Sequence, residues 1–385
     1  MKPSRGNIGI DRISMYTPAY YLDVRELAVA RGVDPDKYTI GIGQDEQAVI
    51  PSSQDAVTMG AAAAADLLTD IDPARLGLVI LGTESGVDAS KAGALYIHEL
   101  LGLPHTVRVM EIKEACYGGT AGLLTARDYV AAHPGAQALV IASDVARYGL
   151  ATGGEVTQGG GAVAMLVSEN PRILTLSADS TVYSESIQDF WRPVYTDEAQ
   201  ARGKYSTEQY LEFFARVWGA SGLSAADCAA VLFHLPYTKM GAKALARLAE
   251  LDAVSDELRA RFQSSITFSR RVGNLYTASL YLGLLSLLCS SSAFEGQLAL
   301  FSYGSGAVGE LFTGQLVEGY EKFLPDVNAL LDARRKVSVD EYENIFRDSV
   351  PYGPEDYATN PDYYCGPFVL TGVAGMERQY ARREE

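Results

Sequence analysis

A weak internal repeat restricts the fold of this chain more than any other feature of its sequence. The segment GGGAVAML at residues 159–166 is similar to GSGAVGEL at residues 304–311, and each follows an apolar, strand-like segment. Upstream of each copy, another apolar segment ends in an ionisable residue, Glu84 in the first half and His234 in the second. Such a set of matches indicates a duplicated unit. We therefore expect two similar halves whose functional groups meet where the halves join.

The length of the chain agrees with this division. The chain has 385 residues, and at roughly 150 residues per domain this predicts two or three domains. We place the boundary near the segment SENPRI and assign residues 1–169 to an N-terminal half and residues 170–385 to a C-terminal half. Hydrophobic residues make up 48% of the chain, so each half can bury a core of its own.

Apolar segments typical of buried strands alternate with small-residue-rich segments typical of helices. The strand candidates are 76–82, 137–143, 161–167, 229–234 and 297–304, and the helix candidates are 56–68, 119–133, 238–251 and 275–288. The strand candidates lack a clean alternation of polar and apolar residues, which favours a sheet covered by helices on both faces. The sequence therefore predicts an α/β architecture.

Charge and hydropathy exclude several classes of protein. The formal net charge is −16, which argues against a nucleic-acid-binding face, because phosphate contacts need clustered lysines and arginines. The N-terminus has no signal-peptide pattern, and the longest apolar run, residues 279–289, is shorter than the roughly 20 residues that cross a bilayer. The four cysteines lack the close spacings of zinc sites or disulfide-dense domains. We expect a cytoplasmic protein with reduced thiols and no membrane association.

Cys116 lies at the start of a predicted helix and is the first candidate for chemistry. A thiolate there would face unpaired N–H groups and the positive end of the helix dipole. The dipole lowers a thiol pKa from about 8.5 by roughly one unit, so a nucleophilic cysteine needs a further partner. The alternative is that Cys116 is a small buried hydrophobic residue with no chemical role.

Glu84 directly follows a predicted buried strand and His234 is the last residue of another, at the sheet edge where active sites form in α/β proteins. Partial burial there would raise the pKa of Glu84 and let it transfer protons near neutrality. The alternative is a solvated loop carboxylate or a helix cap. Lys239 and Lys243 follow His234 and lie four apart, hence on one helix face, where they could bind phosphates or simply be solvated.

None of the four histidines has metal-ligand spacing with another, so no metal site is predicted. The glycine-rich segments 41–44, 152–162 and 302–307 lack the phosphate-loop and dinucleotide-binding patterns. They are interpreted instead as turns that allow close backbone approach around a narrow cavity.

Eight motifs in a fixed order resemble hydroxymethylglutaryl-CoA synthase, in its shorter bacterial form, of the thiolase-like superfamily. The motifs are KYTIGIGQ (37–44), LGTESGVD (81–88), EACYGGTAGL (114–123), GGEVTQGGGAVAML (153–166), DFWRPVY (189–195), HLPYTKMGAKAL (234–245), RVGNLYTASLYL (271–282) and FSYGSGAVGELF (301–312). The resemblance covers nearly the whole chain. It implies a five-layered αβαβα fold made of two duplicated halves.

The resemblance also implies a reaction, the condensation of acetyl-CoA with acetoacetyl-CoA to 3-hydroxy-3-methylglutaryl-CoA in the mevalonate route to isoprenoids. By this match Cys116 is the nucleophile that becomes acetylated, Glu84 is the general acid/base, and His234 polarises the ketone of acetoacetyl-CoA. The remaining matched positions would contact substrate: Asp34, Tyr148, Thr157, Ser206, Lys239, Lys243, Asn274 and Ser305. The CoA thioesters are substrates, so no cofactor is implied, and the superfamily leads us to expect a homodimer.

The implied chemistry agrees with the residue types. A thioester enolises more readily than an ester, so a cysteine acyl carrier suits carbon–carbon bond formation. Main-chain N–H groups at Cys116 and in the Gly-Ser-Gly-Ala turn could stabilise the enolate oxygen. The chain departs from related bacterial sequences at Ala151, Val156 and Gly160, and we expect the absence of an asparagine amide at 151 to affect substrate affinity more than the type of reaction. Ala278, where a glycine is commoner, is expected to have little effect.

Three other functions stay open from the sequence. A ketoacyl synthase of the third type also uses Cys, His and Asn, but it has a histidine instead of a carboxylate in the role of the base. A β-branching synthase of polyketide pathways takes its acetoacetyl group from an acyl carrier protein. A non-catalytic thiolase-like scaffold would lack at least one of Glu84, Cys116 and His234, and all three are present.

Overall fold

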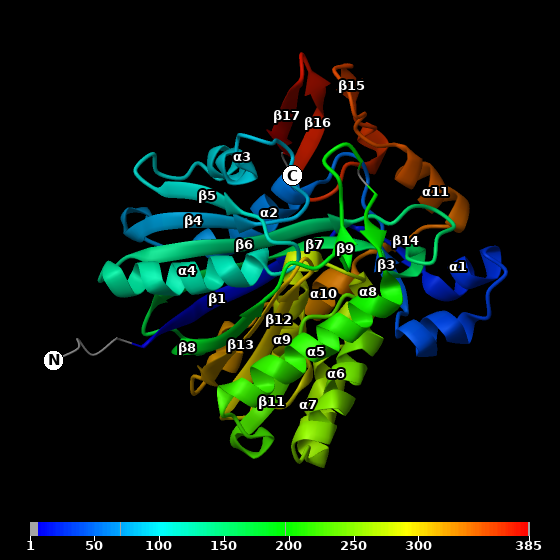
Figure 1. Cartoon of the computed structure of the whole chain (residues 1–385). Coiled ribbons are helices and arrows are strands. Elements are labelled where there is room, and N and C mark those ends of the chain that lie inside the picture. The colour runs from blue at the N-terminus through cyan, green and yellow to red at the C-terminus, as the bar shows by residue number, and fades with distance from the viewer. Residues whose placement is uncertain (1–6, 70, 197, 384–385) are drawn as a thin grey trace.

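Strands and helices alternate along the chain in the computed structural model, which describes residues 7–69, 71–196 and 198–383 (Figure 1). The strands are β1 (Ile8–Tyr16), β2 (Tyr20–Asp23), β3 (Glu46–Ala48), β4 (Leu76–Gly82), β5 (Arg108–Ile112), β6 (Gln137–Ala146), β7 (Gly159–Glu169), β8 (Leu174–Ser184), β9 (Phe190–Trp191), β10 (Gln200–Ala201), β11 (Cys228–Phe233), β12 (Gln297–Gly304), β13 (Val308–Leu316), β14 (Arg335–Lys336), β15 (Tyr357–Ala358), β16 (Phe368–Ala374) and β17 (Glu377–Arg382). The helices are α1 (Val24–Ala30), α2 (Ala56–Ala65), α3 (Gly93–Leu100), α4 (Gly118–Ala132), α5 (Gly203–Ser221), α6 (Thr238–Leu251), α7 (Asp256–Ser265), α8 (Ser269–Val272), α9 (Ser279–Ser290), α10 (Val327–Asp332) and α11 (Val339–Arg347).

All the strands and helices predicted from apolar segments are present. β4, β12 and α6 have the predicted bounds, and the other candidates differ from theirs by a few residues at their ends. Three long strands, β1, β8 and β13, escaped the prediction because their sequences carry polar residues. β8 reads LTLSADSTVYS, and most of its residues beyond Ala178 are exposed.

The strand order repeats between the two halves of the chain. Nine strands form one sheet in the order β11-β12-β13-β8-β1-β7-β6-β4-β5. The order β1-β7-β6-β4 in the first half corresponds to β8-β13-β12-β11 in the second, with one parallel pair and two antiparallel pairs in each. A short antiparallel pairing of β1 with β8 joins them. The duplication predicted from the sequence is thus visible in the topology.

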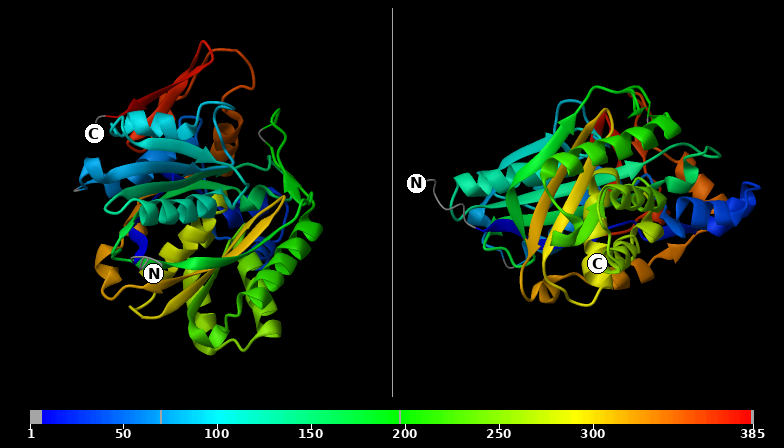
Figure 2. Two further views of the ribbon diagram at one scale, coloured as in Figure 1. Left: turned by 60° about the vertical axis from the view of Figure 1, so that its left-hand side comes forward. Right: turned by 60° about the horizontal axis from the view of Figure 1, so that its bottom comes forward.

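Helices and sheet form five layers, as the views in Figure 2 illustrate. The apolar residues of β4 alternate: Leu78 and Ile80 pack in the central core with α4 and α9, while Val79 and Leu81 pack outward against α2 and α3. In the second half, the inner residues of β11 and β12 reach the same central core and their outer residues pack against α5 and α6. The order of layers is therefore αβαβα.

The last part of the chain returns to the first half. β14 pairs with β2, and apolar residues of α11 share a small core with β2 and α1. β16 and β17, red in Figure 1, lie against α2 and α3, and Phe368 joins the core of the first half. The C-terminal half is therefore not contiguous in space, and the boundary at residues 169 and 170 stays a prediction.

Candidate functional site

Cys116 and Glu84 are in direct contact. The Cys116 thiol donates a hydrogen bond to Glu84 Oε1 at 3.1 Å, although the two residues lie 32 positions apart. Close packing of two elements brings them together: a Cβ on Gly82, at the end of β4, would lie 2.6 Å from the main chain at the start of α4. Only glycine permits this approach. Cys116 therefore sits just before α4, as predicted, with its sulfur against the carboxylate that follows β4.

The pKa of Cys116 departs from the expectation drawn from the helix dipole. Burial removes the thiol from water, and the neighbouring carboxylates of Glu84 and Asp144 further disfavour a thiolate, so the pKa lies well above its ordinary value. The dipole is worth at most about 2 kcal/mol and is outweighed. The expected lowering was wrong for the site without substrate, where the proton stays on the sulfur.

Glu84 titrates near neutrality. Burial raises the pKa of this carboxyl to about 8, helped by the nearby Asp144 carboxylate, while the Cys116 hydrogen bond and the Arg192 guanidinium act in the opposite direction. Glu84 also lines a cleft of about 1290 Å³. A carboxyl with this pKa can take up and return a proton at physiological pH.

Asp144, at the end of β6, holds the Glu84 segment in place and was missed by the sequence reasoning. This fully buried carboxylate accepts hydrogen bonds on Oδ1 from Thr83 Oγ1 and from the main-chain N–H groups of Glu84 and Ser85, at 2.8–2.9 Å. Oδ2 accepts from the N–H and the hydroxyl of Thr277 in the second half. A polar residue near the end of an otherwise apolar strand was the signal that pointed to it.

Two non-glycine residues beside Cys116 adopt left-handed backbone conformations. Ala115 has φ 41° and Tyr276 has φ 44°, and Tyr276 packs against Cys116. Each such residue costs about 1–2 kcal/mol and persists only where the surrounding structure fixes it. Strain of this kind is typical of functional sites.

Asn274 reaches the Cys116 region through aromatic residues. Its amide nitrogen donates to Tyr148 Oη at 3.0 Å, and the rings of Tyr148 and Tyr276 meet edge to face with centroids 6.1 Å apart. Tyr148 and Phe190 pack on the small apolar cluster that contains Cys116. Two predicted substrate contacts, Tyr148 and Asn274, are thus hydrogen-bonded to each other next to the thiol.

His234 is buried directly after β11, as predicted. Burial lowers the pKa of its imidazole to about 3, so the ring is neutral at physiological pH. Its main-chain N–H donates to Phe301 O at 2.8 Å and its carbonyl accepts from Tyr210 Oη at 2.8 Å. Within the described residues, no hydrogen bond joins the imidazole to Cys116 or Glu84. The predicted convergence of all three groups is therefore direct only for the cysteine and the glutamate.

Asp189 organises the other wall of the site. Its Oδ1 accepts from the Gly306 N–H at 2.9 Å, and its Oδ2 accepts from Tyr303 Oη at 2.9 Å and from Ser206 Oγ at 3.3 Å. Ser305 lines the same cleft as Glu84, as an acyl-pocket residue would. The Ser206 hydroxyl donates to Asp189. The Gly306 N–H also donates to Asp189, so this N–H is not free to stabilise an enolate, contrary to what the sequence suggested for this turn.

The remaining predicted contacts belong neither to the lining of the cleft beside Glu84 nor to the small cluster that contains Cys116. Lys239 and Lys243 are both exposed on α6, and Lys243 Nζ lies 3.2 Å from Tyr237 Oη. Asp34 is exposed before the short π-helix η1 (Lys37–Ile42), and Thr157 ends the turn η4 (Glu155–Thr157). Thr157 is half-buried and its carbonyl accepts from the Asn274 N–H at 3.2 Å, whereas only polar character and exposure mark the other three.

No group of histidine, cysteine, aspartate or glutamate side chains in the described part of the chain is arranged to hold a metal ion. The four cysteines are unbridged thiols. Across residues 7–69, 71–196 and 198–383, no helix is both long and apolar enough to span a bilayer.

Two family models match the sequence. The hydroxymethylglutaryl-coenzyme A synthase N-terminal model matches residues 4–171, and the corresponding C-terminal model matches residues 250–364. The chain belongs to the hydroxymethylglutaryl-coenzyme A synthase family. Its fold is accordingly the thiolase-like one that the sequence motifs implied.

Comparison with individual members of the synthase family supports this assignment. The chain is 51% identical to hydroxymethylglutaryl-CoA synthase of Enterococcus faecalis over 89% of this chain and 92% of the relative. It is similar to a crystal structure of HMG-CoA synthase complexed with CoA, with a TM-score of 0.94 and 41% identity over 98% and 100% of the two chains. A polyketide-biosynthesis 3-hydroxy-3-methylglutaryl-ACP synthase of Bacillus subtilis is more distant, at 32% identity over 89% and 88%.

Ala151, one departure from related synthase sequences, has a structural consequence. Its φ is 55°, in the left-handed region where asparagine is tolerated far better than alanine. Its N–H donates to Glu155 Oε2 at 2.9 Å, which holds the turn. Of the other two departures, Val156 is buried in η4, and Gly160 packs closely on Ile50, where a Cβ would lie 2.6 Å from the isoleucine side chain.

Proposed function

We propose that this chain condenses acetyl-CoA with acetoacetyl-CoA and water to form 3-hydroxy-3-methylglutaryl-CoA and CoA through an acetyl-Cys116 intermediate. The observation that carries the proposal is the 3.1 Å hydrogen bond between the Cys116 thiol and Glu84, in a chain 51% identical to a synthase of this name. A thiol beside a carboxyl that titrates near neutrality is what acyl transfer followed by enolisation needs.

In the first step, Cys116 Sγ forms a bond to the acetyl carbonyl carbon of acetyl-CoA. The bond from that carbon to the CoA sulfur breaks, and CoA leaves as a thiol. Glu84 Oε1, which already accepts the thiol hydrogen, is placed to relay this proton. The raised pKa of Cys116 keeps the thiolate population small, so this relay speeds acetylation without being required for it.

In the second step, the Glu84 carboxylate takes a proton from the acetyl methyl group, and the enolate carbon attacks the ketone carbon of acetoacetyl-CoA. Glu84 then returns the proton to the tertiary alkoxide. His234 is neutral, so we assign it the donation of a ring N–H to the ketone oxygen rather than ionic stabilisation.

In the last step, water attacks the thioester carbonyl on Cys116 and the carbon–sulfur bond breaks; one proton of the water goes to the Cys116 sulfur, and the other is released to solvent with the carboxylate product. The cleft beside Glu84 offers water a route to this bond. Ser305 and Asn274 line the acyl pocket in this proposal, and Asp34, Tyr148, Thr157, Ser206, Lys239 and Lys243 contact the CoA-bearing substrate.

We further propose a cytoplasmic homodimer that acts in the mevalonate pathway without a cofactor. The family membership and the polar, redox-neutral chemistry of thioester condensation support this, and the net charge of −16 agrees with a small-molecule enzyme that binds no nucleic acid.

Mass spectrometry of the intact protein tests the proposal. Acetyl-CoA should add one acetyl group to the wild type and none to Cys116→Ala, and free acetoacetyl-CoA should then remove the label as product forms. A label that disappears only with carrier-bound acetoacetyl groups would identify a β-branching synthase instead. A wild-type chain that never acquires a label would contradict both functions.

A further inference from the structure

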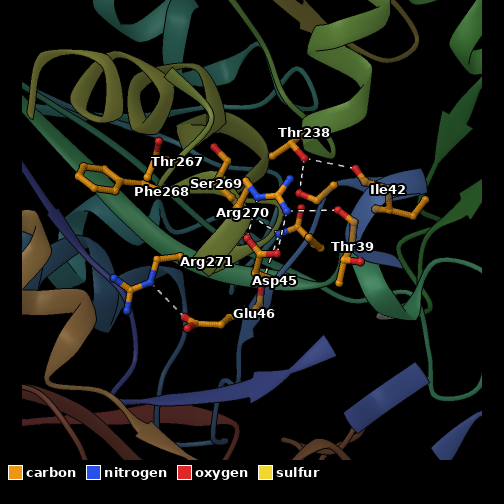
Figure 3. A network of polar contacts seen from close by, with 12 residues as sticks. Thr39, Ile42, Asp45, Glu46, Thr238, Thr267, Phe268, Ser269, Arg270 and Arg271 are labelled. Atoms are coloured by element: carbon orange, nitrogen blue, oxygen red, sulfur yellow. Dashed lines mark hydrogen bonds and ion pairs between the residues drawn. The ribbon is translucent and has the colours of Figure 1, made fainter. Parts of the chain in front are cut away.

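A cluster of polar contacts around Arg270 joins three segments that carry predicted substrate contacts. Arg270 lies in α8, four residues before Asn274. Its guanidinium donates to both carboxylate oxygens of Asp45, at 2.6 and 2.7 Å, and to the main-chain carbonyl of Thr39 at 3.2 Å (Figure 3). The Asp45 N–H donates back to the Arg270 carbonyl at 2.9 Å. The main chain and side chain of Arg270 therefore both hold the segment that contains Thr39 and Asp45.

The same segment is also fixed from the side of α6. Thr238, the first residue of α6, donates its hydroxyl to the carbonyl of Gly43 and lies 3.3 Å from that of Ile42 (Figure 3). A Cβ on Gly43 would lie 2.1 Å from Thr238 Oγ1, and the φ of Gly43 is 86°, so only glycine fits there. Lys239 follows Thr238 directly.

Residues 37–42 have little apolar packing of their own. Only Thr39 of the π-helix η1 is buried, and Ile40 is 63% exposed. Tyr38 is half-buried against the small core around β2, so the rest of the segment depends on its polar contacts for its position. π-Helical turns are rare and are found mostly at functional sites, which agrees with a segment whose geometry serves binding.

We infer that Arg270 is a positioning residue that, through Asp45 and the Thr39 carbonyl, holds residues 37–44 against α6 and α8 so that the mouth of the substrate site is preformed. The inference rests on the proposed function, in which Asp34, Lys239 and Asn274 contact the CoA-bearing substrate. Arg270 itself touches none of the reacting atoms. Its loss weakens CoA binding because binding must then also order this segment.

The neighbouring Arg271 provides a matched control. It belongs to the same short helix and makes ion pairs of its own, with Asp332 at 2.8 Å and with Glu46 at 3.2 Å, and the Glu46 pair lies on the side of Asp45 away from Thr39 (Figure 3). A loss of charge at 271 perturbs α8 without releasing residues 37–42.

The test compares Arg270→Gln, Arg270→Lys, Asp45→Asn and Arg271→Gln in the full chain, with free CoA as the probe. For Arg270→Gln and Asp45→Asn, the Kd for CoA and the KM for both thioesters should rise about five- to tenfold, as expected for losing a partly solvated charge-assisted pair. The kcat at saturation should change by less than about twofold. Arg270→Lys should be intermediate, because it keeps the charge but not the bidentate geometry.

Hydrogen exchange of residues 37–43 provides a readout that does not depend on activity. Exchange should be faster in Arg270→Gln than in wild type and in Arg271→Gln. The double variant Arg270→Gln/Asp45→Asn should exchange no faster than either single variant, because both substitutions remove the same ion pair. Wild-type exchange and CoA affinity in a folded Arg270→Gln would overturn the inference, as would equal effects of Arg271→Gln. A wild type that binds CoA but does not condense would instead refute the proposed function alone.

Discussion

Asp144 accepts a hydrogen bond from the main-chain N–H of Thr277 at 3.0 Å while its other oxygen holds the Glu84 segment. One buried carboxylate thus links the loop after β4 in the first half to the turn before α9 in the second. The groups that hydrogen-bond to this carboxylate are all donors, so the position suits a group with two acceptor oxygens.

Asp144→Asn should destabilise the protein and impair condensation. The new amide NH₂ would face N–H donors, leaving buried groups unsatisfied, so we expect the free energy of unfolding to fall by about 2 kcal/mol or more. Urea denaturation measures this loss. The exposed Asp179 in β8 offers a control, since Asp179→Asn should change stability by less than about 0.5 kcal/mol. Equal stability of the two variants would show that the linkage has no energetic role.

Glu84→Ala should separate acetylation from condensation. The thioester exchange at Cys116 persists without the carboxylate, whereas removal of the methyl proton does not, so condensation should fall by about 10²–10⁴-fold while labelling by acetyl-CoA remains. Intact-mass measurement and product assay on one preparation provide both readouts. Condensation by Glu84→Ala at the wild-type rate would show that Glu84 is not the general acid/base.

The condensation rate should rise with pH up to about 8. Glu84 must be ionised to accept the methyl proton, and burial raises its pKa to about 8, so the active fraction grows up to about tenfold per pH unit below that value and then levels off. Single-turnover measurements on acetylated protein between pH 6 and 9.5 check this. A rate that falls from pH 6 to 8 would require a protonated Glu84 in the step.

The same raised pKa predicts a pH-dependent stability. Between about 4.5 and 8 the folded chain keeps a proton on Glu84 that the unfolded chain has lost, so stability from this group is full below 4.5 and declines as pH rises to 8. A glutamine at position 84 cannot ionise, so Glu84→Gln does not show this loss of stability with rising pH. The variant should therefore exceed wild type in Tm by a margin that grows from pH 5 to 8 and is constant above it. A difference in Tm between Glu84→Gln and wild type that does not change with pH would contradict the raised pKa of Glu84.

Substitutions at Ala151 can separate backbone strain from substrate contact. Ala151→Asn and Ala151→Gly should each stabilise the protein, by about 0.5–1 kcal/mol for asparagine and less for glycine, which also loosens the unfolded chain. If the family amide contacts substrate, only asparagine should also lower the KM for acetoacetyl-CoA. Ala246→Gly, in the exposed middle of α6, serves as the control and should cost about 1 kcal/mol. Destabilisation by both substitutions at 151 would refute the strain argument.

The sequence predicted those elements whose apolar pattern is continuous or regularly periodic along their length. β4 and α6 are apolar or regularly amphipathic over their whole length, and their bounds agree with the prediction. β1 and β8 escaped because β1 contains Asp11 and Arg12 and much of β8 faces water, so neither has the continuous apolar run of a covered strand. Their mutual pairing, which joins the halves, is a long-range property that local patterns do not carry.

The sequence also identified residues that lie at strand and helix ends, but not those that hold them. Glu84, Cys116 and His234 follow or precede regular elements, which is a local signal. Asp144 and Asp189 act through partners 60 or more positions away, such as Glu84 and Gly306, so their role is visible only in three dimensions. The direction of the Cys116 pKa was mispredicted for the same reason, because its burial and its carboxylate neighbours come from distant segments.

The return of the C-terminal segment to the first half affects how the protein is made. Phe368 completes the outer core of the N-terminal half, and Tyr342 and Ile345 complete the small core around β2. During translation these residues leave the ribosome well after the N-terminal half, so that half emerges with apolar surface that nothing yet covers. Its final compaction must wait until these residues are synthesised, and a chain truncated before them would expose an apolar face that chaperones and proteases recognise.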